Sequence, residues 1–420
     1  MSEWKEYKLG EVYDFSSGLS KPREFFGKGF GFVSFKDVFY NYFLPEQLTE
    51  LVMSTDKEQI SCSVKKGDVF LTRTSETMEE LGMSTVALKD YPLATFNGFT
   101  KRLRPKDPSL ISPKFAGYYF RSPLFRATVS SYAIMTTRAS LNNEILGRLT
   151  ISLPDFKTQE SIGEVLKSLD DKIELNNKIN QELEALAQTL FKQWFIDFEF
   201  PNENGEPYKS SGGEMVESEL GEIPKGWVVK PYSEIADIKL GGTPSSMKPE
   251  YWDGEIPWVN SGGINKNYII KGVKGISELG LKKSATKLIR ENSTLIAITG
   301  ATLGQVSYSF IEACYNQSVV SLTTDKLINE YVHQYVLFFI ADLTSHQTGG
   351  AQQHINKGDV ENSSMLLPLN GILENFKSII YSLYRKIELN LKELEYLTNL
   401  RDTLLPKLIS GELEINEIRN

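Results

Sequence analysis

Two long stretches of the chain repeat apolar residues at alternating steps of three and four positions. In the first stretch the series contains Ile162, Leu166, Leu169, Ile173, Leu183, Leu190 and Trp194, with Asn176, Asn180 and Ala187 in its remaining positions. In the second it contains Phe376, Ile380, Leu383, Ile387, Leu394, Leu397, Leu404 and Leu408, with Asn390 and Arg401 in its gaps. A mean period of 3.5 residues is typical of a heptad seam. The pattern therefore predicts two long helices that pack on each other as a coiled coil.

Asn176 and Asn390 occupy equivalent positions of the two seams. A polar seam residue costs stability and can fix the register of a coiled coil. It can also be a tolerated polar layer near an exposed edge, and the sequence leaves both interpretations open.

The stretches before the two predicted helices contain short apolar or β-branched runs bounded by turn residues, among them 69–72 and 295–298. Such runs are typical of strands. Each stretch ends with a predicted helix, around Pro113–Arg126 and Asn329–Leu343. We therefore expect an α+β protein.

The chain contains two copies of one unit. Residues 172–176 (Lys-Ile-Glu-Leu-Asn) recur as residues 386–390, an offset of 214, and Asn142 matches Asn356 at the same offset. Toward the N-terminus the offset drifts, and we pair Tyr118 with Tyr335, Asn97 with Asn316, and Trp4 with Trp227. A register sustained over this length indicates a duplication rather than chance.

Linker composition separates the two copies, since residues 201–213 are rich in Pro, Gly, Asn and Ser. We expect a first domain over 1–157, a helix over 158–198, a linker over 199–224, a second domain over 225–370, a helix over 371–413 and a tail over 414–420.

Charge is distributed unevenly along the chain, whose net charge is −8. Residues 158–224 carry 5 Lys or Arg and 15 Asp or Glu, whereas 1–157 carry 21 and 18, and 225–370 carry 13 of each. The acidity is thus concentrated in one segment, and the larger domains can present basic patches to nucleic acid. Cys62 and Cys314 lie too far apart in the sequence for a CxxC pair, and we expect reduced thiols in a cytoplasmic protein without signal peptide or membrane span.

Sequence signals for catalysis are absent. The histidines His333, His346 and His354 form no HExxH motif, and no zinc-type Cys/His spacing, GxSxG motif or phosphate-binding loop occurs. The chain also lacks the Asn/Asp-Pro-Pro-Tyr/Phe tetrapeptide of amino-methyltransferases. We therefore expect a non-catalytic chain with no bound metal, in which residues 300–304 form a tight turn after a strand.

Basic and amide side chains on the predicted loops could contact a DNA duplex. Lys and Arg commonly contact phosphates, and Arg, Asn and Gln can bind base edges in the major groove. The candidates are Lys36, Arg73, Lys101, Arg102, Arg104 and Arg138 in the first domain, and Lys271, Lys274, Lys282, Lys283, Thr302, Gln305, Gln352, Gln353 and Asn356 in the second. For each charged residue, simple solvation remains an alternative.

Several segments of the second copy resemble Type I restriction specificity subunits. Residues 239–245 and 250–259 are similar to the opening of a target-recognition domain in that family. Residues 299–306 and 349–356 resemble its second and third common segments, and residues 387–413 resemble its C-terminal helix. The first copy departs from this pattern at 31–38 and 136–142.

The resemblance implies two tandem, similar target-recognition domains, over 1–157 and 225–370, each followed by a long helix. The two helices would form an antiparallel coiled coil that sets the spacer of a bipartite DNA target. They would dock two modification (methyltransferase) subunits, which bind S-adenosylmethionine, while restriction subunits add ATP- and Mg²⁺-dependent translocation and cleavage. This chain would carry no cofactor of its own.

Two other functions remain open from the residues alone. One is a scaffold of two adaptor domains on a coiled coil that binds no nucleic acid, which the acidic composition favours. The other is a solitary modification or restriction enzyme, against which the missing tetrapeptide counts.

Overall fold

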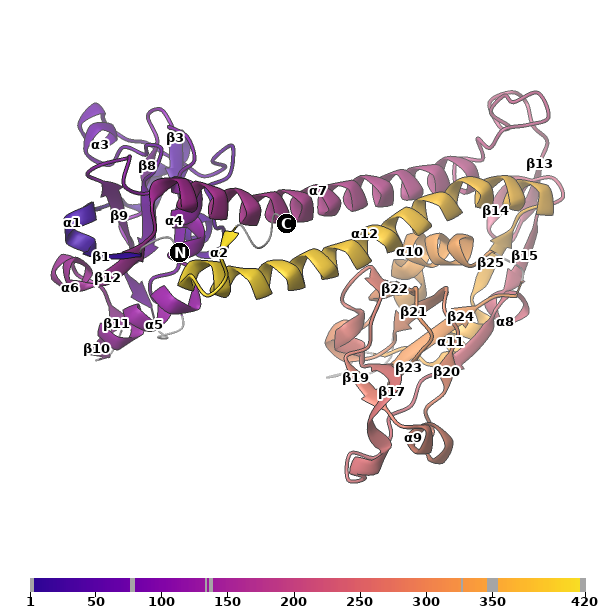
Figure 1. Cartoon of the computed structure of the whole chain (residues 1–420). Coiled ribbons are helices and arrows are strands. Elements are labelled where there is room, and N and C mark those ends of the chain that lie inside the picture. Colours follow the sequence, from indigo (N-terminus) through magenta and orange to yellow (C-terminus); the bar gives the residue numbers. More distant parts are fainter. Residues whose placement is uncertain are drawn as a thin grey trace. The chain divides into compact units, whose positions relative to one another are not determined.

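A computed structural model describes residues 4–75, 80–132, 134–135, 139–325, 328–345 and 354–415 (Figure 1). The chain divides into two compact units: unit 1 is Met1–Glu174 with Glu395–Asn420, and unit 2 is Leu175–Leu394. Each of the two long helices therefore contributes to both units. No helix among the described residues is long and apolar enough to cross a membrane.

Unit 1 is built on a four-stranded sheet in the order β2–β9–β5–β7 and a smaller sheet in the order β4–β3–β8. The four-stranded sheet is antiparallel, and all four residues of β5 are buried in it. The strands are β1 (Lys5–Lys8), β2 (Tyr13–Ser17), β3 (Phe26–Val33), β4 (Leu51–Val52), β5 (Val69–Thr72), β6 (Thr74–Ser75), β7 (Ser84–Val86), β8 (Thr95–Phe96), β9 (Thr100–Pro105), β10 (Ile134–Met135), β11 (Ala139–Ser140) and β12 (Thr150–Leu153). The helices are α1 (Leu9–Val12), η1 (Arg23–Phe25), α2 (Phe35–Tyr40), α3 (Asp56–Ser61), α4 (Pro113–Tyr119), α5 (Pro123–Tyr132) and α6 (Asn143–Arg148).

Unit 2 has a five-stranded sheet in the order β16–β24–β21–β22–β18 and a four-stranded sheet in the order β19–β17–β23–β20. Its strands are β13 (Met215–Ser218), β14 (Gly221–Pro224), β15 (Val228–Pro231), β16 (Asp237–Leu240), β17 (Trp252–Val259), β18 (Tyr268–Ile269), β19 (Lys274–Ile276), β20 (Leu288–Ile289), β21 (Ser293–Ala297), β22 (Val306–Ser309), β23 (Ala313–Tyr315), β24 (Val319–Thr323) and β25 (Ser364–Leu367). Its helices are α8 (Tyr232–Ile235), η2 (Pro249–Tyr251), η3 (Ser261–Ile264), α9 (Glu278–Lys283), η4 (Gly300–Thr302), α10 (Asn329–Ser345) and α11 (Lys357–Asn362).

The two units repeat the same pairings, which confirms the duplication. In unit 1, β3 pairs antiparallel with β4 across a register shift and parallel with β8. In unit 2, β17 makes the equivalent pairings with β19 and β23, also with a register shift. The N–H of Asn97 donates to Val33 (3.1 Å) as that of Asn316 donates to Val259 (3.1 Å), so this predicted equivalence is correct.

One predicted equivalence is wrong by a single residue. The hydroxyl of Tyr335 accepts a hydrogen bond from the N–H of Leu366 (3.2 Å), and it is the hydroxyl of Tyr119 that accepts from Ser152 (2.9 Å). Ser152 in β12 and Leu366 in β25 hold equivalent positions, because β12 pairs with β1 as β25 pairs with β15. Tyr119 rather than Tyr118 is therefore the counterpart of Tyr335. Two adjacent tyrosines in the sequence concealed this shift.

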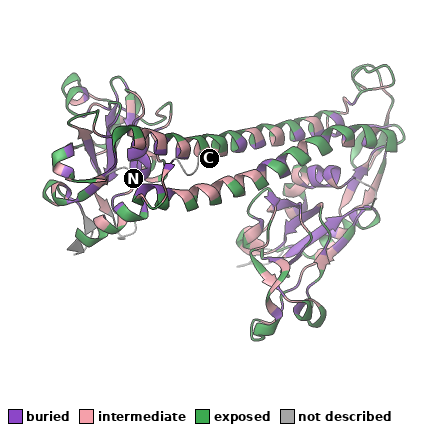
Figure 2. Ribbon diagram, viewed as in Figure 1, coloured by how far each residue is buried: buried purple, intermediate pink, exposed green. Residues whose placement is uncertain are grey.

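The long helices are α7 (Phe156–Phe195) and α12 (Asn370–Ser410). Their heptad seams are buried or half-buried along both helices, while the intervening residues are mostly exposed (Figure 2). Within unit 2, Asn176 binds Glu393 and Asn180 binds Asn390, while Trp194 packs on Phe376 with ring centroids 5.7 Å apart. Positions rise on one helix as they fall on the other, so the coiled coil is antiparallel.

The polar layer of this coiled coil is buried. Asn176 and Asn390 are each 1% exposed and Asn180 is 6% exposed. The amide of Asn390 donates to Oδ1 of Asn180 (2.9 Å), and the Nδ2 of Asn180 has no partner. The interpretation as a layer near an exposed edge is therefore wrong, whereas a register-fixing role stays a prediction.

Two other expected elements differ from the structure. The helix expected over Pro113–Arg126 is two helices, α4 and α5, because Pro123 has no N–H to continue α4 and the hydroxyl of Ser122 caps the new helix at Phe125. The linker expected over 199–224 ends in the hairpin β13–β14, and at its start Phe200 stacks on Tyr208 (4.6 Å) and Trp227 (5.2 Å).

Candidate nucleic-acid interface

Arg102 and Arg104 project from one face of β9 into polar pockets of unit 1. Arg104 makes a two-pronged ion pair with the fully buried Asp68, at 2.7 Å from Nε and 2.6 Å from Nη2. Arg102 is 8% exposed and donates to the carbonyl of Ser63 (2.7 Å). Burial and the neighbouring Arg104 lower the pKa of Arg102. Both guanidinium groups thus support the fold, and their contact with DNA stays a prediction.

Lys101 lies on the opposite face of β9, because side chains alternate along a strand. It is 8% exposed, and its ammonium donates to Ser17 Oγ (2.9 Å) and Asn143 Oδ1 (2.8 Å). Burial, followed by repulsion from Arg73, lowers the pKa of Lys101. Arg73 is half-buried just after β5, and its Nε is enclosed without a hydrogen-bond partner among the described residues. The structure therefore brings Arg73 and Lys101 together.

The other predicted residue of unit 1 with a described position is Lys36, which is exposed in the first turn of α2. The hydroxyl of Ser34 caps this helix by accepting from Asp37 (3.2 Å). Arg138 lies outside the described residues.

The predicted lysines of unit 2 are all exposed. Lys274 extends over the ring of Trp252, with its ammonium 5.5 Å from the ring centroid. Lys282 and Lys283 end α9, where Lys282 lies 3.8 Å from Glu278. Lys271 lies just before β19. Exposed cations on neighbouring elements of one small sheet could contact a phosphate backbone.

Residues 300–304 form the tight turn that was expected after a strand. Gly304 has a φ of +81° and donates its N–H to Ala297 (2.9 Å), as Gly82 with a φ of +71° donates to Thr72 (3.1 Å) in unit 1. A positive φ favours glycine at both places. Thr302 and Gln305 are half-buried at this turn, and within the described ranges the Oε1 of Gln305 is enclosed without a hydrogen-bond partner.

Asn356 caps α11, since its Oδ1 accepts the N–H of Asp359 (3.1 Å), as Asn142 caps α6 by accepting from Ile145 (2.8 Å). This shared cap explains why both copies contain asparagine here, and base contact by Asn356 stays a prediction. Gln352 and Gln353 lie outside the described residues, as does His346. Among the described residues, no cluster of His, Cys, Asp or Glu is arranged to bind a metal.

The loop before η2 carries exposed side chains that were not among the predicted contacts. Met247 is 89% exposed there, and the ammonium of Lys248 lies 4.9 Å from the ring centroid of Tyr251 and 3.1 Å from its hydroxyl. In the sequence, the only signal for this loop is its Gly- and Pro-containing stretch at 241–249.

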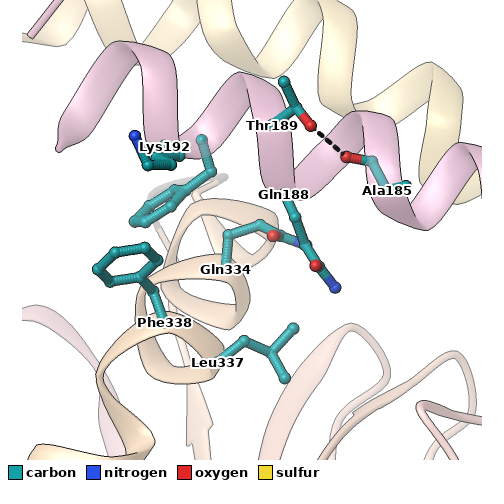
Figure 3. A pocket seen from close by; sticks show the side chains of 8 residues that line it. Ala185, Gln188, Thr189, Lys192, Gln334, Leu337 and Phe338 are labelled. Atoms are coloured by element: carbon teal, nitrogen blue, oxygen red, sulfur yellow. Dashed lines mark hydrogen bonds between the residues drawn. The ribbon is translucent and has the colours of Figure 1, made fainter. Parts of the chain in front are cut away.

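A hollow of about 530 Å³ lies between α7 and α10 in unit 2. Figure 3 shows Phe338 and Leu337 of α10 facing Gln188 and Lys192 of α7. Phe338 is 45% exposed, and its ring centroid lies 6.1 Å from that of Phe191. This partly apolar hollow on a coiled-coil helix could accept a protein side chain.

Different polar contacts connect the long helices to the rest of each unit. In unit 1, Asp170 accepts from Tyr118 (2.6 Å) and from Arg401 (2.8 Å). Burial opposes the charge of Arg401, but its hydrogen bonds to Asp170 and Asp402 outweigh this and raise its pKa. In unit 2 the corresponding contact joins neutral groups. The hydroxyl of Tyr384 forms a hydrogen bond with Nδ1 of His333 (2.5 Å) and accepts one from Nε2 of Gln334 (2.7 Å).

Comparison with known proteins gives a consistent family. The model of the Type I restriction modification DNA specificity domain matches residues 1–185 and 224–399. The chain is 28% identical over 418 residues to the Type I restriction enzyme MjaIX specificity subunit of Methanocaldococcus jannaschii, covering 98% of this chain and 93% of the relative. It is 25% identical over 475 residues to the HindI specificity subunit of Haemophilus influenzae, covering 98% and 100%.

A solved structure is similar in fold. The S subunit of a Type I restriction–modification system from M. genitalium superimposes with a TM-score of 0.63 at 15% identity, covering 97% of this chain and 96% of that one.

Proposed function

Because the chain belongs to the Type I restriction modification DNA specificity domain family, we propose that it is the non-catalytic subunit that reads a bipartite DNA target for its partner subunits. The observation that carries this proposal is the repeated unit. Two copies of one fold, each ending in a long helix, can read two half-sites. The two domains over 1–157 and 225–370 would be the two target-recognition domains. A scaffold without DNA binding is not favoured, since the family model covers both copies.

The proposed DNA contacts are the predicted residues whose cations are exposed or have no acidic partner in the described part of the chain. In unit 2 these are the exposed Lys271, Lys274, Lys282 and Lys283, and in unit 1 Lys36, Arg73 and Lys101. Gln305, with its enclosed and unpartnered Oε1, is a candidate for base recognition after a small movement of the turn.

We propose that α7 and α12 set the spacer between half-sites and dock two modification subunits. Support comes from the net acidity of residues 158–224, which would repel DNA phosphates. Leu175 and Leu389, at equivalent positions outside the seams, are 51% and 48% exposed and could contact a protein partner. Replacement of both by Asp should abolish co-purification with the modification subunit while leaving the circular dichroism spectrum unchanged. Unchanged co-purification would exclude these two positions from the docking surface.

The chemistry would belong to the partners. S-adenosylmethionine would be bound by the modification subunits, and ATP and Mg²⁺ by restriction subunits, with this chain supplying only binding and position. We place the complex in the cytoplasm, in keeping with Cys62 and Cys314, which are both buried free thiols.

The function is tested by selecting bound duplexes from a random DNA library with the full chain and its modification subunit. We expect enrichment of one split motif with a fixed spacer, and binding that weakens steeply with salt. Recovery of unenriched DNA, with equal affinity for all sequences, would contradict sequence recognition.

A further inference from the structure

Arg73 and Lys101 share one face of the central sheet of unit 1. Leu71 of β5 is directly opposite Lys101 of β9, and Arg73 follows Leu71 by two positions, so alternation places it on the same face. The N–H of Arg73 donates to the carbonyl of Phe99 (3.1 Å), which fixes the backbone next to Lys101.

These two cations have no acidic partner among the described residues. The ammonium of Lys101 binds only the neutral oxygens of Ser17 and Asn143. The side chain of Arg73 makes no hydrogen bond or ion pair within the described part of the chain, although its Nε is enclosed. Burial lowers the pKa of Lys101, and repulsion from the neighbouring Arg73 lowers it further.

Unit 2 shows that the fold does not need charge at these positions. Leu141 donates its N–H to the carbonyl of Arg73 (2.8 Å), as Ile355 does to that of Ile298 (3.1 Å). In unit 1, Lys101 pairs with Leu71, which lies two positions before Arg73. In unit 2, Val320 pairs with Ile296, which lies two positions before Ile298. Val320 is therefore the counterpart of Lys101. Ile298 is 5% exposed and Val320 is fully buried. An aliphatic pair thus fills the space that the two cations fill in unit 1.

A buried ammonium beside a half-buried guanidinium destabilises a fold when neither has a counterion, since a buried charge is tolerated when paired. The neighbouring Arg104 follows this rule, because it binds the carboxylate of Asp68. The pair Arg73 and Lys101 departs from it within the described part of the chain, and a bound anion would supply the counterion.

We propose that Arg73 and Lys101 form an anion site of unit 1 that binds one phosphate oxyanion, supplied by the DNA backbone. The proposal rests on the proposed function and deepens it. The planar Arg fork can bind two phosphate oxygens, and Lys adds a point charge. Since unit 2 has Ile298 and Val320 instead, the half-site read by unit 1 carries one phosphate contact that the other half-site lacks.

The test replaces the pair with its counterparts from unit 2, as R73I/K101V in the full chain. The aliphatic pair is already compatible with this fold, so the variant should fold, and its melting temperature should rise because the repulsion is removed. The control is K89V/K106V, which removes two cations of the same unit that lie 2.5 Å from Glu46 and 3.9 Å from Asp14.

The first measurement is the dissociation constant for the selected target duplex and for a random duplex between 0.1 and 0.4 M salt. Loss of one phosphate contact lowers the slope of log affinity against log salt by about 0.9, which corresponds to about eightfold weaker binding at 0.1 M and about fourfold at 0.2 M. Both duplexes should weaken alike, because a phosphate contact carries no sequence information. The control should keep the wild-type slope.

The second measurement separates DNA from free phosphate. Inorganic phosphate is added at constant ionic strength, and the melting temperature of the wild type and R73I/K101V is compared. If phosphate raises the melting temperature of the wild type alone, and the slope of log DNA affinity against log salt is the same in both proteins, the anion site is supported with free phosphate as its ligand. An unchanged slope together with equal phosphate responses would overturn the anion site. Absence of salt-dependent DNA binding by the wild type would instead contradict the proposed function, and the phosphate response would still decide the anion site.

Discussion

The buried amide pair of the coiled coil gives a stability prediction with a definite sign. Asn390 donates to Asn180 at 2.9 Å, and the Nδ2 of Asn180 is buried without a partner. The perturbation is replacement by Leu, first at position 390 alone and then at both positions.

The magnitudes follow from what each change leaves behind. Leu at position 390 adds about 1.5–3 kcal/mol of apolar burial. It also leaves the amide of Asn180 without any partner, which costs about 1–3 kcal/mol. The single variant should therefore be close to the wild type in stability. The double variant N180L/N390L removes that cost and should be more stable than the wild type by about 2 kcal/mol or more.

The assay is urea unfolding followed by tryptophan fluorescence. Four of the five tryptophans, Trp194, Trp227, Trp252 and Trp258, lie in unit 2 with the amide pair, so the signal reports mainly on that unit. If the amides also fix register, the double variant should give several species by sedimentation despite its higher stability. A double variant less stable than the wild type by 1 kcal/mol or more would refute the reasoning.

Four further outcomes are expected. Replacement R104A should destabilise unit 1 by about 2–3 kcal/mol, because it leaves the carboxylate of Asp68 buried and unpaired. Replacement K274A should leave the melting temperature unchanged and weaken DNA binding several-fold, because Lys274 is an exposed candidate for a phosphate contact. Burial lowers the pKa of His333 from 6.5 to about 3, so only the unfolded chain gains its proton in this range. The free energy of unfolding should therefore fall by about 1.4 kcal/mol per unit as pH drops below 6.5. Burial raises the pKa of Glu330, which makes the free energy of unfolding change with pH in the opposite direction. The contribution of His333 is therefore measured as the difference in pH dependence between the wild type and H333Q from pH 5 to 6.5. The same pH dependence in both proteins would exclude a contribution from His333. Deletion of one heptad from each long helix at facing positions should shorten the spacer of the methylated motif by roughly three base pairs, since a heptad rises about 10 Å; an unchanged spacer would contradict the role of the helices in spacing.

The two paired helices and the duplicated unit could be predicted, because both produce periodic patterns in the sequence. The seams around Leu166 and Ile387 have a period that only a paired helix satisfies, and the duplication extended each inference to the other copy. The packing of Phe200 on Trp227 could not be predicted, because no short pattern announces contacts of an irregular segment.

The candidate DNA contacts were harder to predict, because the sequence does not show whether a basic side chain contacts solvent, a carboxylate or a ligand. Arg104 proved to bind Asp68, which is separated from it by 36 positions, and Lys101 proved to be buried. Only the fold brings such partners together. The asparagine cap at Asn356 likewise explains a repeated motif through local backbone geometry rather than base recognition.

The most direct test of the central claim is a map of DNA methylation in a host without other methyltransferases. The chain would be expressed with the modification subunit of its system, and each protein would be expressed alone. We predict methylated adenines in one split motif only when both proteins are present. Methylation of the same motif by the partner alone, or methyl transfer by this chain alone, would contradict its role as the non-catalytic reader of the target.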